Sequence, residues 1–219
     1  MAPHCREFPI RGRSRHTCSV TTAAPILILA SGSKARLRVL RDAGFHPEVV
    51  VSGVDETVGA MTTGEAVVVI AERKASTVAE RFVEALVLGC DSMLDLDGES
   101  LGKPTSQAEI ISGWARLAGR EVQLFTGHCL IDTRSGGRVR AVASTRIRFG
   151  RPTIEELELY AATGEALQMA GGFSIEGRGG PFVESIDGSP TNVMGLSLPH
   201  LRSMLADVGV RISDLWTEQ

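Results

Sequence analysis

A short segment of small, hydroxyl-bearing and basic residues is the first place where this sequence could do chemistry. Residues 29–36 (LASGSKAR) combine the end of a predicted strand, a turn with Ser31 and Ser33, and the start of a helix that carries Arg36. Backbone N–H groups and the positive helix end favour anions there, phosphate above all. Arg36 can bind two phosphate oxygens at once. The segment fits neither GxxxxGK[ST] nor GxGxxG, so an ordinary helix cap is the alternative.

A single acidic residue stands directly after a short apolar run. Asp91 follows the predicted buried strand 86–90, and the carboxyl ends of strands border the ligand crevice in α/β sheets. An ionised aspartate at that edge could bind Mg²⁺ or accept a proton from water. A turn-capping aspartate is the alternative interpretation.

Two further charged sites follow predicted strands. Lys103 lies between Gly102 and a proline, where its ammonium group could be a point-charge partner for phosphate. Asp55 and Glu56 are adjacent, so their carboxylates repel each other unless a cation lies between them or they point apart. A surface turn and a solvated loop pair are the respective alternatives.

Lysine is rare in this chain. Of 23 basic residues only three are lysines, at positions 34, 74 and 103. Codon preference for arginine explains the scarcity in general. It does not explain which positions keep lysine, and a chain that usually carries arginine can retain lysine where a compact point charge matters.

Composition limits the class of protein. The chain has 219 residues, a formal net charge of −3, 43% hydrophobic and 22% charged residues, which is typical of a globular protein with one large domain or two packed lobes. This mix excludes a disordered chain. The longest apolar stretch, residues 23–30, is far shorter than the roughly 20 residues of a membrane span. A near-neutral charge also argues against stable nucleic-acid binding.

Cysteines and histidines show no metal-binding spacing. We expect free buried thiols in a reducing cytoplasm, because the cysteines are few and widely separated. We expect the histidines at 46, 128 and 200 to be structural. The cysteines lie at positions 5, 18, 90 and 129.

Strands and helices alternate from residue 25 onward. Periodicity, caps and turn residues predict an α/β protein with a mixed sheet in two lobes and a central cleft. Residues 1–24 carry a net charge of +3 and no periodicity, which predicts a disordered basic arm before a single two-lobed domain, 25–219. The predicted strands are 26–30, 46–51, 86–90, 93–96, 99–101, 122–132, 139–149 and 182–186. The predicted helices are 34–43, 63–85, 107–119, 154–164 and 199–208, three of them opened by capping boxes at Thr62, Ser106 and Thr153.

Taken in chain order, these segments resemble the Maf (septum-formation inhibitor) family. The resemblance spans roughly residues 26–200, and the combination is specific although no single motif is. It rests on residues 30–33 with Arg36, Asp55-Glu56, Lys74-Ala75, 89–92 (GCDS), Asp97-Gly98, 101–104 (LGKP), Thr126-Gly127, 170–177 and 192–196.

The resemblance implies a cytoplasmic nucleoside triphosphate pyrophosphatase that releases a nucleoside monophosphate and pyrophosphate. It implies the fold of the inosine triphosphate pyrophosphatases, a divalent metal cation (Mg²⁺ or Mn²⁺) and a homodimer. Members are thought to keep non-standard nucleotides out of nucleic acid and are linked to cell-division arrest. The alternative is a nucleotide-binding regulator of septation with little turnover, which pyrophosphate release would distinguish.

The resemblance also assigns roles to residues. Asp91 matches the catalytic proton acceptor, and Asp91 with Glu56 are the candidate metal ligands. Ala35, Ser92 and Glu176 fall at positions tied to substrate specificity, and they differ from the arginine, threonine and glutamine of the branch that acts on dTTP and UTP. Because a carboxylate only accepts hydrogen bonds, Glu176 favours a guanine-like or cytosine-like base edge. The candidate substrate-binding residues are Ser31, Ser33, Arg36, Glu56, Lys74 and Lys103.

Overall fold

The computed structural model describes residues 25–167 and 169–216. The predicted basic arm, residues 1–24 with two of the four cysteines, lies outside the described residues. The described chain forms a seven-stranded sheet in the order β2-β1-β3-β5-β6-β7, with β4 paired to β3. None of its helices has the length and hydrophobicity needed to cross a bilayer.

The sheet is mixed, as predicted. Strand β1 pairs in parallel with β2 and β3, and all other pairs are antiparallel. The strands are β1 (Ile26–Leu29), β2 (Glu48–Val49), β3 (Ala85–Leu96), β4 (Glu99–Leu101), β5 (Glu121–Asp132), β6 (Gly137–Phe149) and β7 (Val183–Asp187). The helices are α1 (Lys34–Asp42), α2 (Thr63–Ala79), α3 (Gln107–Leu117), α4 (Ile154–Ala162), α5 (Pro190–Val193) and α6 (Leu198–Asp207), with 3-10 turns η1 (Ala170–Gly172), η2 (Gly180–Phe182) and η3 (Ile212–Leu215).

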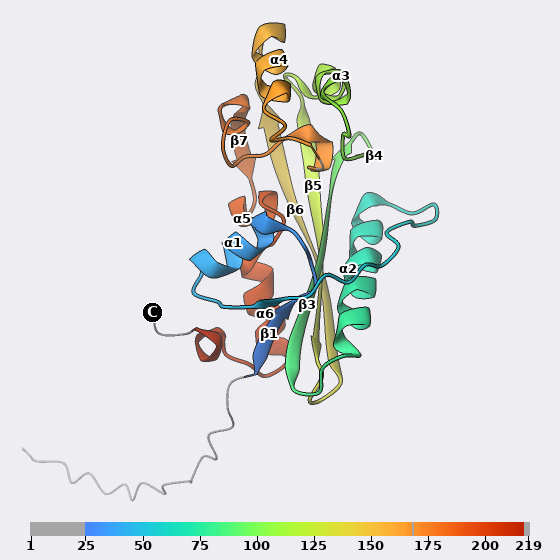
Figure 1. Cartoon of the computed structure of the whole chain (residues 1–219), viewed down its shortest axis with the longest axis vertical. Coiled ribbons are helices and arrows are strands. Elements are labelled where there is room, and N and C mark those ends of the chain that lie inside the picture. The colour runs from blue at the N-terminus through green and yellow to red at the C-terminus, as the bar shows by residue number, and fades with distance from the viewer. Residues whose placement is uncertain (1–24, 168, 217–219) are drawn as a thin grey trace, which may run out of the picture.

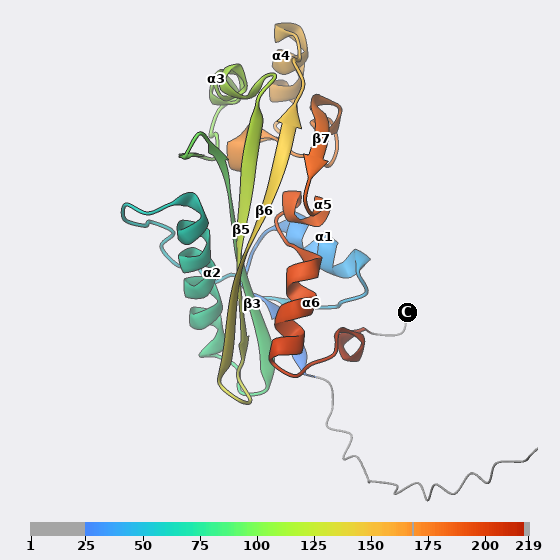
Figure 2. The same ribbon diagram turned by 180° about the vertical axis from the view of Figure 1, so that it is seen from behind.

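Three long strands, β3, β5 and β6, join two lobes (Figure 1). We call the end with β1, α1, α2 and α6 the α6 lobe, and the end with β4, α3, α4 and β7 the α3 lobe. In the α3 lobe, the buried Trp114 packs edge-on against Phe149, Tyr160 and Phe182. In the α6 lobe, α2 and α6 cover opposite faces of the sheet (Figure 2). Each lobe therefore has its own hydrophobic core.

The core of the α6 lobe has two parts, one on each face of the sheet, because the side chains of β3 alternate between the faces. Leu86 and Leu88 face α6, while Ala85 and Val87 face α2, because successive strand residues point to opposite faces. The free cysteines Cys90 and Cys129 are buried, as expected for both described thiols.

Helix α2 lies unusually close to the sheet. A Cβ atom on Gly89 would come within 2.1 Å of the Ala71 carbonyl oxygen, and one on Gly127 within 2.2 Å of Val67 backbone atoms. Only glycine allows this approach of helix and strand. The close packing places α2 beside the middle of β3, where Lys74 of α2 contacts Asp91 of β3.

Several predicted elements are corrected. Residues 86–90 and 93–96 belong to one continuous strand, so Asp91 lies inside β3 and not after a strand end. Asp91 lies between α2, whose Lys74 contacts its carboxylate, and β5, whose Gly127 pairs with it in the sheet. Strand β2 has only two residues, because pairing with β1 ends there. Helix α5 was not predicted, since four residues carry too little periodicity.

Helix boundaries show one further correction. Helix α2 ends at Ala79 and not near residue 85, because tighter turns at Arg81 and Phe82 close it and Phe82 packs against the core. Capping boxes form at Thr62 and Thr153. At Ser106 only half of the predicted box forms, since the Glu109 carboxylate accepts from the Thr105 backbone N–H instead.

Candidate active site

A cavity of about 730 Å³ lies between the two lobes. It is lined by the turn before α1, by the middle of β3, and by parts of both lobes that are far apart in the sequence. All ten side chains predicted to take part in the site line this one cavity: Ser31, Ser33, Ala35, Arg36, Glu56, Lys74, Asp91, Ser92, Lys103 and Glu176. Their convergence is a structural fact, and their roles stay predictions.

One side of the cavity is a chain of alternating charges. Lys74 Nζ lies 2.8 Å from Asp91 Oδ1 and 2.7 Å from Glu56 Oε1. Lys103 Nζ lies 3.4 Å from the other oxygen of Glu56. Lys74 and Asp91 are buried, whereas the side chains of Glu56 and Lys103 are nearly half exposed. Lys103 lies between β4 and α3 of the α3 lobe, so its contact with Glu56 joins that lobe to the loop before α2.

The adjacent carboxylates of Asp55 and Glu56 point apart. The Asp55 carboxylate accepts from the Thr57 backbone N–H at 2.9 Å, while Glu56 turns into the cavity toward the two lysines. Partial burial raises the pKa of Glu56, but hydrogen bonding and attraction from Lys74 and then Lys103 outweigh it and hold this pKa below its usual value. Glu56 is therefore an anion at neutral pH.

The other side of the cavity holds a cation with uncharged partners. Arg36 donates from Nε to the Gly195 carbonyl (2.8 Å), from Nη1 to Ser31 Oγ (2.9 Å) and from Nη2 to Ser92 Oγ (3.0 Å). Ser92 in turn shares a hydrogen bond with Thr126. Within the described chain, three of the five guanidinium N–H groups thus have a partner and two have none.

The turn before α1 forms as predicted. Ser33 is the N-cap of α1, and its hydroxyl accepts from the Arg36 backbone N–H at 3.4 Å. Lys34 is the first helical residue and lies exposed on the cavity wall. The first turn of α1 contains no acidic residue. Helix end and basic side chains together make this wall attractive to anions.

Two of the predicted specificity residues have partners that the sequence did not reveal. The Ser92 hydroxyl holds Arg36 and Thr126. The half-buried Glu176 carboxylate forms an ion pair with Arg38, which lies on α1 one turn beyond Ala35. Sequence patterns gave no signal for Arg38, because its partner is 138 residues away.

Gly195 was also missed as an individual residue. Its carbonyl accepts from Arg36, and its φ of +95° is a conformation that glycine adopts without strain. The sequence motif of residues 192–196 includes Gly195 but does not single it out. Thr126, fully buried beside Ser92, likewise appeared only within a motif.

The donor set fits a divalent cation only in part. The described residues contain no cluster of three or more histidine, cysteine, aspartate or glutamate side chains that could hold a metal ion. Asp91 and Glu56 do present two carboxylates to one cavity. Mg²⁺ is commonly held by one or two carboxylates together with substrate phosphates, so these two residues fit a metal that arrives with a nucleotide.

His46, His128 and His200, the histidines of the described residues, do not line this cavity. His128 is fully buried and accepts from the Ser197 backbone N–H through Nε2 at 2.9 Å. It stacks on His200 at 6.0 Å between ring centroids. Neither histidine lines the cavity.

Two proteins that share one name are similar to this chain over most of its length. A protein named nucleoside triphosphate pyrophosphatase from Streptomyces coelicolor is 53% identical over 193 residues, 87% of this chain and 94% of that protein. One of the same name from Rhodococcus erythropolis is 45% identical over 207 residues, 88% of this chain and 97% of that protein. Among solved structures, the Ham1 protein of Staphylococcus aureus aligns with a TM-score of 0.39 and 16% identity over 57% of this chain and 71% of that chain, a similarity too low to support a conclusion.

The family assignment rests on more than these relatives. The profile described as Maf-like protein matches residues 26–208. That range contains β1, α1, β3 and every side chain that lines the cavity. Because both the profile and the relatives cover nearly all of the described chain, the protein belongs to the Maf family.

Proposed function

We propose that this protein hydrolyses nucleoside triphosphates to the monophosphate and pyrophosphate. One observation above all supports this function: Arg36, Lys74 and Lys103 come together with the carboxylate of Asp91 in a single cavity between the lobes. The names of the curated relatives agree with it.

Phosphate oxygens bind first on the Arg36 side of the cavity, and the polyphosphate extends from there toward Lys103. The two unused guanidinium N–H groups of Arg36 and the N-terminus of α1 donate to phosphate oxygens. Ser31, Ser92 and Gly195 fix the guanidinium before substrate arrives. Such preorganised donors lower the energy of a transition state because they need not reorient during the reaction.

Asp91 orients the attacking water and accepts its proton. A bond forms between the water oxygen and the α-phosphorus, and the bond from that phosphorus to the bridging oxygen breaks as pyrophosphate leaves. Lys74 holds the Asp91 carboxylate through Oδ1, so Oδ2 is the atom we assign to the water. Lys103 reaches the cavity from the α3 lobe and can neutralise the departing pyrophosphate.

Asp91 and Glu56 would hold a divalent cation, Mg²⁺ or Mn²⁺, together with the substrate phosphates. When bound, such a cation neutralises negative charge on the phosphate oxygens. Lys74 keeps both carboxylates facing the same space in advance, because its ammonium group contacts one oxygen of each.

The base is recognised near Ala35 and Glu176. The small Ala35 leaves room beside the start of α1, and Glu176 accepts hydrogen bonds from base N–H groups. We therefore propose a preference for a guanine-like or cytosine-like edge over thymine or uracil. Arg38 keeps the Glu176 carboxylate at the wall of the cavity.

Wider predictions remain part of the proposal. We propose that residues 25–219 form one two-lobed domain preceded by a basic arm, that the protein acts as a homodimer in the cytoplasm, and that it has no stable nucleic-acid partner. Size-exclusion chromatography with light scattering would test the dimer.

The test of the function is pyrophosphate release from a panel of canonical and modified nucleoside triphosphates, with Mg²⁺, with Mn²⁺ and with a chelator. We expect equal amounts of monophosphate and pyrophosphate, and loss of turnover in chelator. Tight nucleotide binding without pyrophosphate release would favour the regulator of septation instead. Exclusive hydrolysis of dTTP and UTP would contradict the base preference inferred from Glu176.

A further inference from the structure

The loop that carries Glu56 has almost no backbone support of its own. Backbone hydrogen bonds to β1 end at Val50, and the next helix is capped by Thr62. Within the described chain, no backbone-to-backbone hydrogen bond involves residues 51–61. Something else must hold Glu56 in place for its carboxylate to lie between Lys74 and Lys103.

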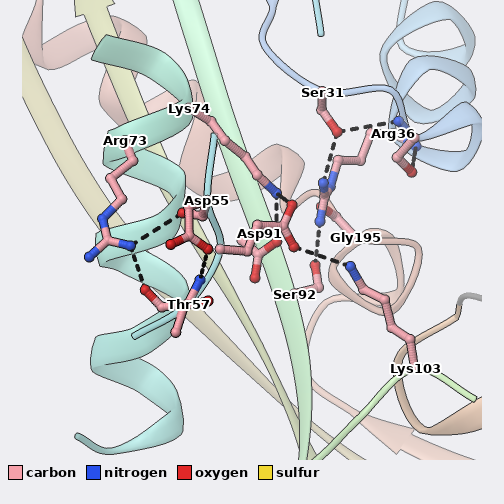
Figure 3. A network of polar contacts seen from close by, with 12 residues as sticks. Ser31, Arg36, Asp55, Thr57, Arg73, Lys74, Asp91, Ser92, Lys103 and Gly195 are labelled. Atoms are coloured by element: carbon pink, nitrogen blue, oxygen red, sulfur yellow. Dashed lines mark hydrogen bonds and ion pairs between the residues drawn. The ribbon is translucent and has the colours of Figure 1, made fainter. Parts of the chain in front are cut away.

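Arg73 holds this loop from outside. Its Nη1 donates to the carbonyl oxygen of Thr57 at 2.7 Å and to that of Asp55 at 3.3 Å. These two carbonyls flank Glu56 on either side. The Asp55 carboxylate closes the same turn by accepting from the Thr57 N–H. One guanidinium group therefore fixes the backbone at the base of the Glu56 side chain (Figure 3).

Arg73 and Lys74 are neighbours on α2 but point to different parts of the loop. Lys74 is buried and holds the Glu56 carboxylate inside the cavity. Arg73 is exposed, and it lines a shallow outer groove instead of the cavity. Because Arg73 does not line the cavity, its hydrogen bonds to the loop are its direct connection to Glu56.

We infer that Arg73 is a positioning residue for the proposed active site: it fixes the backbone on both sides of Glu56, so that this carboxylate stays between the two lysines. The inference rests on the proposed function. Arginine suits the task because Nη1 carries two N–H groups on a rigid planar group, and this one nitrogen donates to both carbonyl oxygens. The competing interpretation is a surface contact that only stabilises the fold.

A double-mutant cycle separates these interpretations, because two residues that act through each other are not additive. The variants are Arg73→Ala, Glu56→Gln and the pair, with pyrophosphate release as the readout. We expect Arg73→Ala to lower kcat/KM about tenfold in the wild-type background, less than the roughly 10²-fold that a 1 Å misplacement of reacting groups can cost. In the Glu56→Gln background we expect less than a twofold further loss.

The matched control is Arg140→Ala. Arg140 is another exposed arginine that contacts α2, where it donates to Glu72, the residue before Arg73, at 3.0 Å. In the part of the chain that the structure describes it has no hydrogen bond or ion pair to residues 51–61, so we expect wild-type activity. Arg73→Lys keeps a cationic donor group on a more flexible side chain and should restore part of the activity. An equal loss from Arg73→Ala in both backgrounds, or no loss in the wild-type background, would overturn the inference.

A second readout does not depend on turnover. Amide hydrogen exchange at Thr57, whose N–H donates to the Asp55 carboxylate, should rise in Arg73→Ala and stay unchanged in Arg140→Ala, because only the first variant frees the loop. Unchanged exchange there would refute the positioning role, whatever the reaction. Absence of pyrophosphate release from the wild-type protein together with increased exchange would overturn the proposed function alone.

Discussion

Two buried cations face the same cavity with opposite kinds of partner. Arg36 is 8% exposed and Lys74 is 6% exposed, so each is largely removed from water. Arg36 is held by two hydroxyls and a carbonyl, and no carboxylate pairs with it among the described residues. Lys74 contacts two carboxylates.

The difference indicates what each cation is for. A buried charge is unfavourable unless it is paired or hydrogen-bonded. The hydrogen bonds of Arg36 meet part of that need but leave its positive charge uncancelled, which favours an incoming anion. The charge of Lys74 is cancelled locally, so Lys74 holds two carboxylates together. Under the proposed function, Arg36 therefore contacts the polyphosphate directly, and the carboxylates that Lys74 holds would bind a cation and orient the attacking water.

The largest effect is expected at Asp91. Asp91→Asn keeps an oxygen that can accept from Lys74 but loses the group that accepts a proton, so turnover should fall by about 10²-fold or more. Nucleotide affinity should change little. Initial rates of pyrophosphate release and calorimetric titration with a non-hydrolysable nucleotide measure the two quantities. Retained turnover would remove Asp91 from the mechanism.

Changes at Arg36 should lower nucleotide affinity more than turnover, which is the reverse of the pattern expected at Asp91. Arg36→Lys keeps the charge but cannot serve Ser31, Ser92, Gly195 and a phosphate at once, so nucleotide affinity should fall by roughly tenfold. The same titration tests this, with Arg41→Lys on the outer side of α1 as the control. If Arg36→Lys lowers turnover at saturating substrate and leaves affinity intact, the division of the cavity into two sides is wrong.

His128 extends the comparison to a third buried side chain, whose ring nitrogen Nδ1 has no acceptor among the described residues. Its Nδ1 has no partner in the described chain, and burial together with nearby positive charge lowers its pKa to about 3. Since the unfolded state binds the proton near pH 6.5 and the folded state does not, stability should fall as pH drops below 6.5 toward 3. Arg36, in similar burial, has three hydrogen-bond acceptors among the described residues.

The expected loss between pH 7.5 and pH 5.5 is about 1 kcal/mol in the free energy of unfolding. Urea denaturation at the two pH values measures it. His128→Gln should flatten this pH dependence, while His46→Gln, at an exposed position, should keep it. A wild-type protein equally stable at both pH values would show that His128 titrates normally.

Local signals predicted the fold well and the contacts between distant segments poorly. Caps at Ser33, Thr62 and Thr153 act within one turn of a helix, so the sequence reveals them. The place of Asp91 inside β3 depends on how α2 packs over Gly89, which no local pattern encodes. Contacts such as those of Arg38 and Arg73 join residues 16 to 138 positions apart, and only the folded chain brings them together.

The smallest effect is expected at Lys34, where stability and binding should move in opposite directions. A lysine at the first position of α1 opposes the helix dipole, an effect of about 0.3–1 kcal/mol at exposed sites, and no acidic residue in that turn offsets it. Lys34→Ala should therefore raise the melting temperature slightly. It should also raise KM about twofold, because the lysine lies on the cavity wall beside the phosphate site.

Arg41→Ala, in the last turn of the same helix, should lower stability and leave KM unchanged. If Lys34→Ala leaves KM unchanged, Lys34 lies outside the anion-binding side, and that side is limited to Arg36 and the helix end.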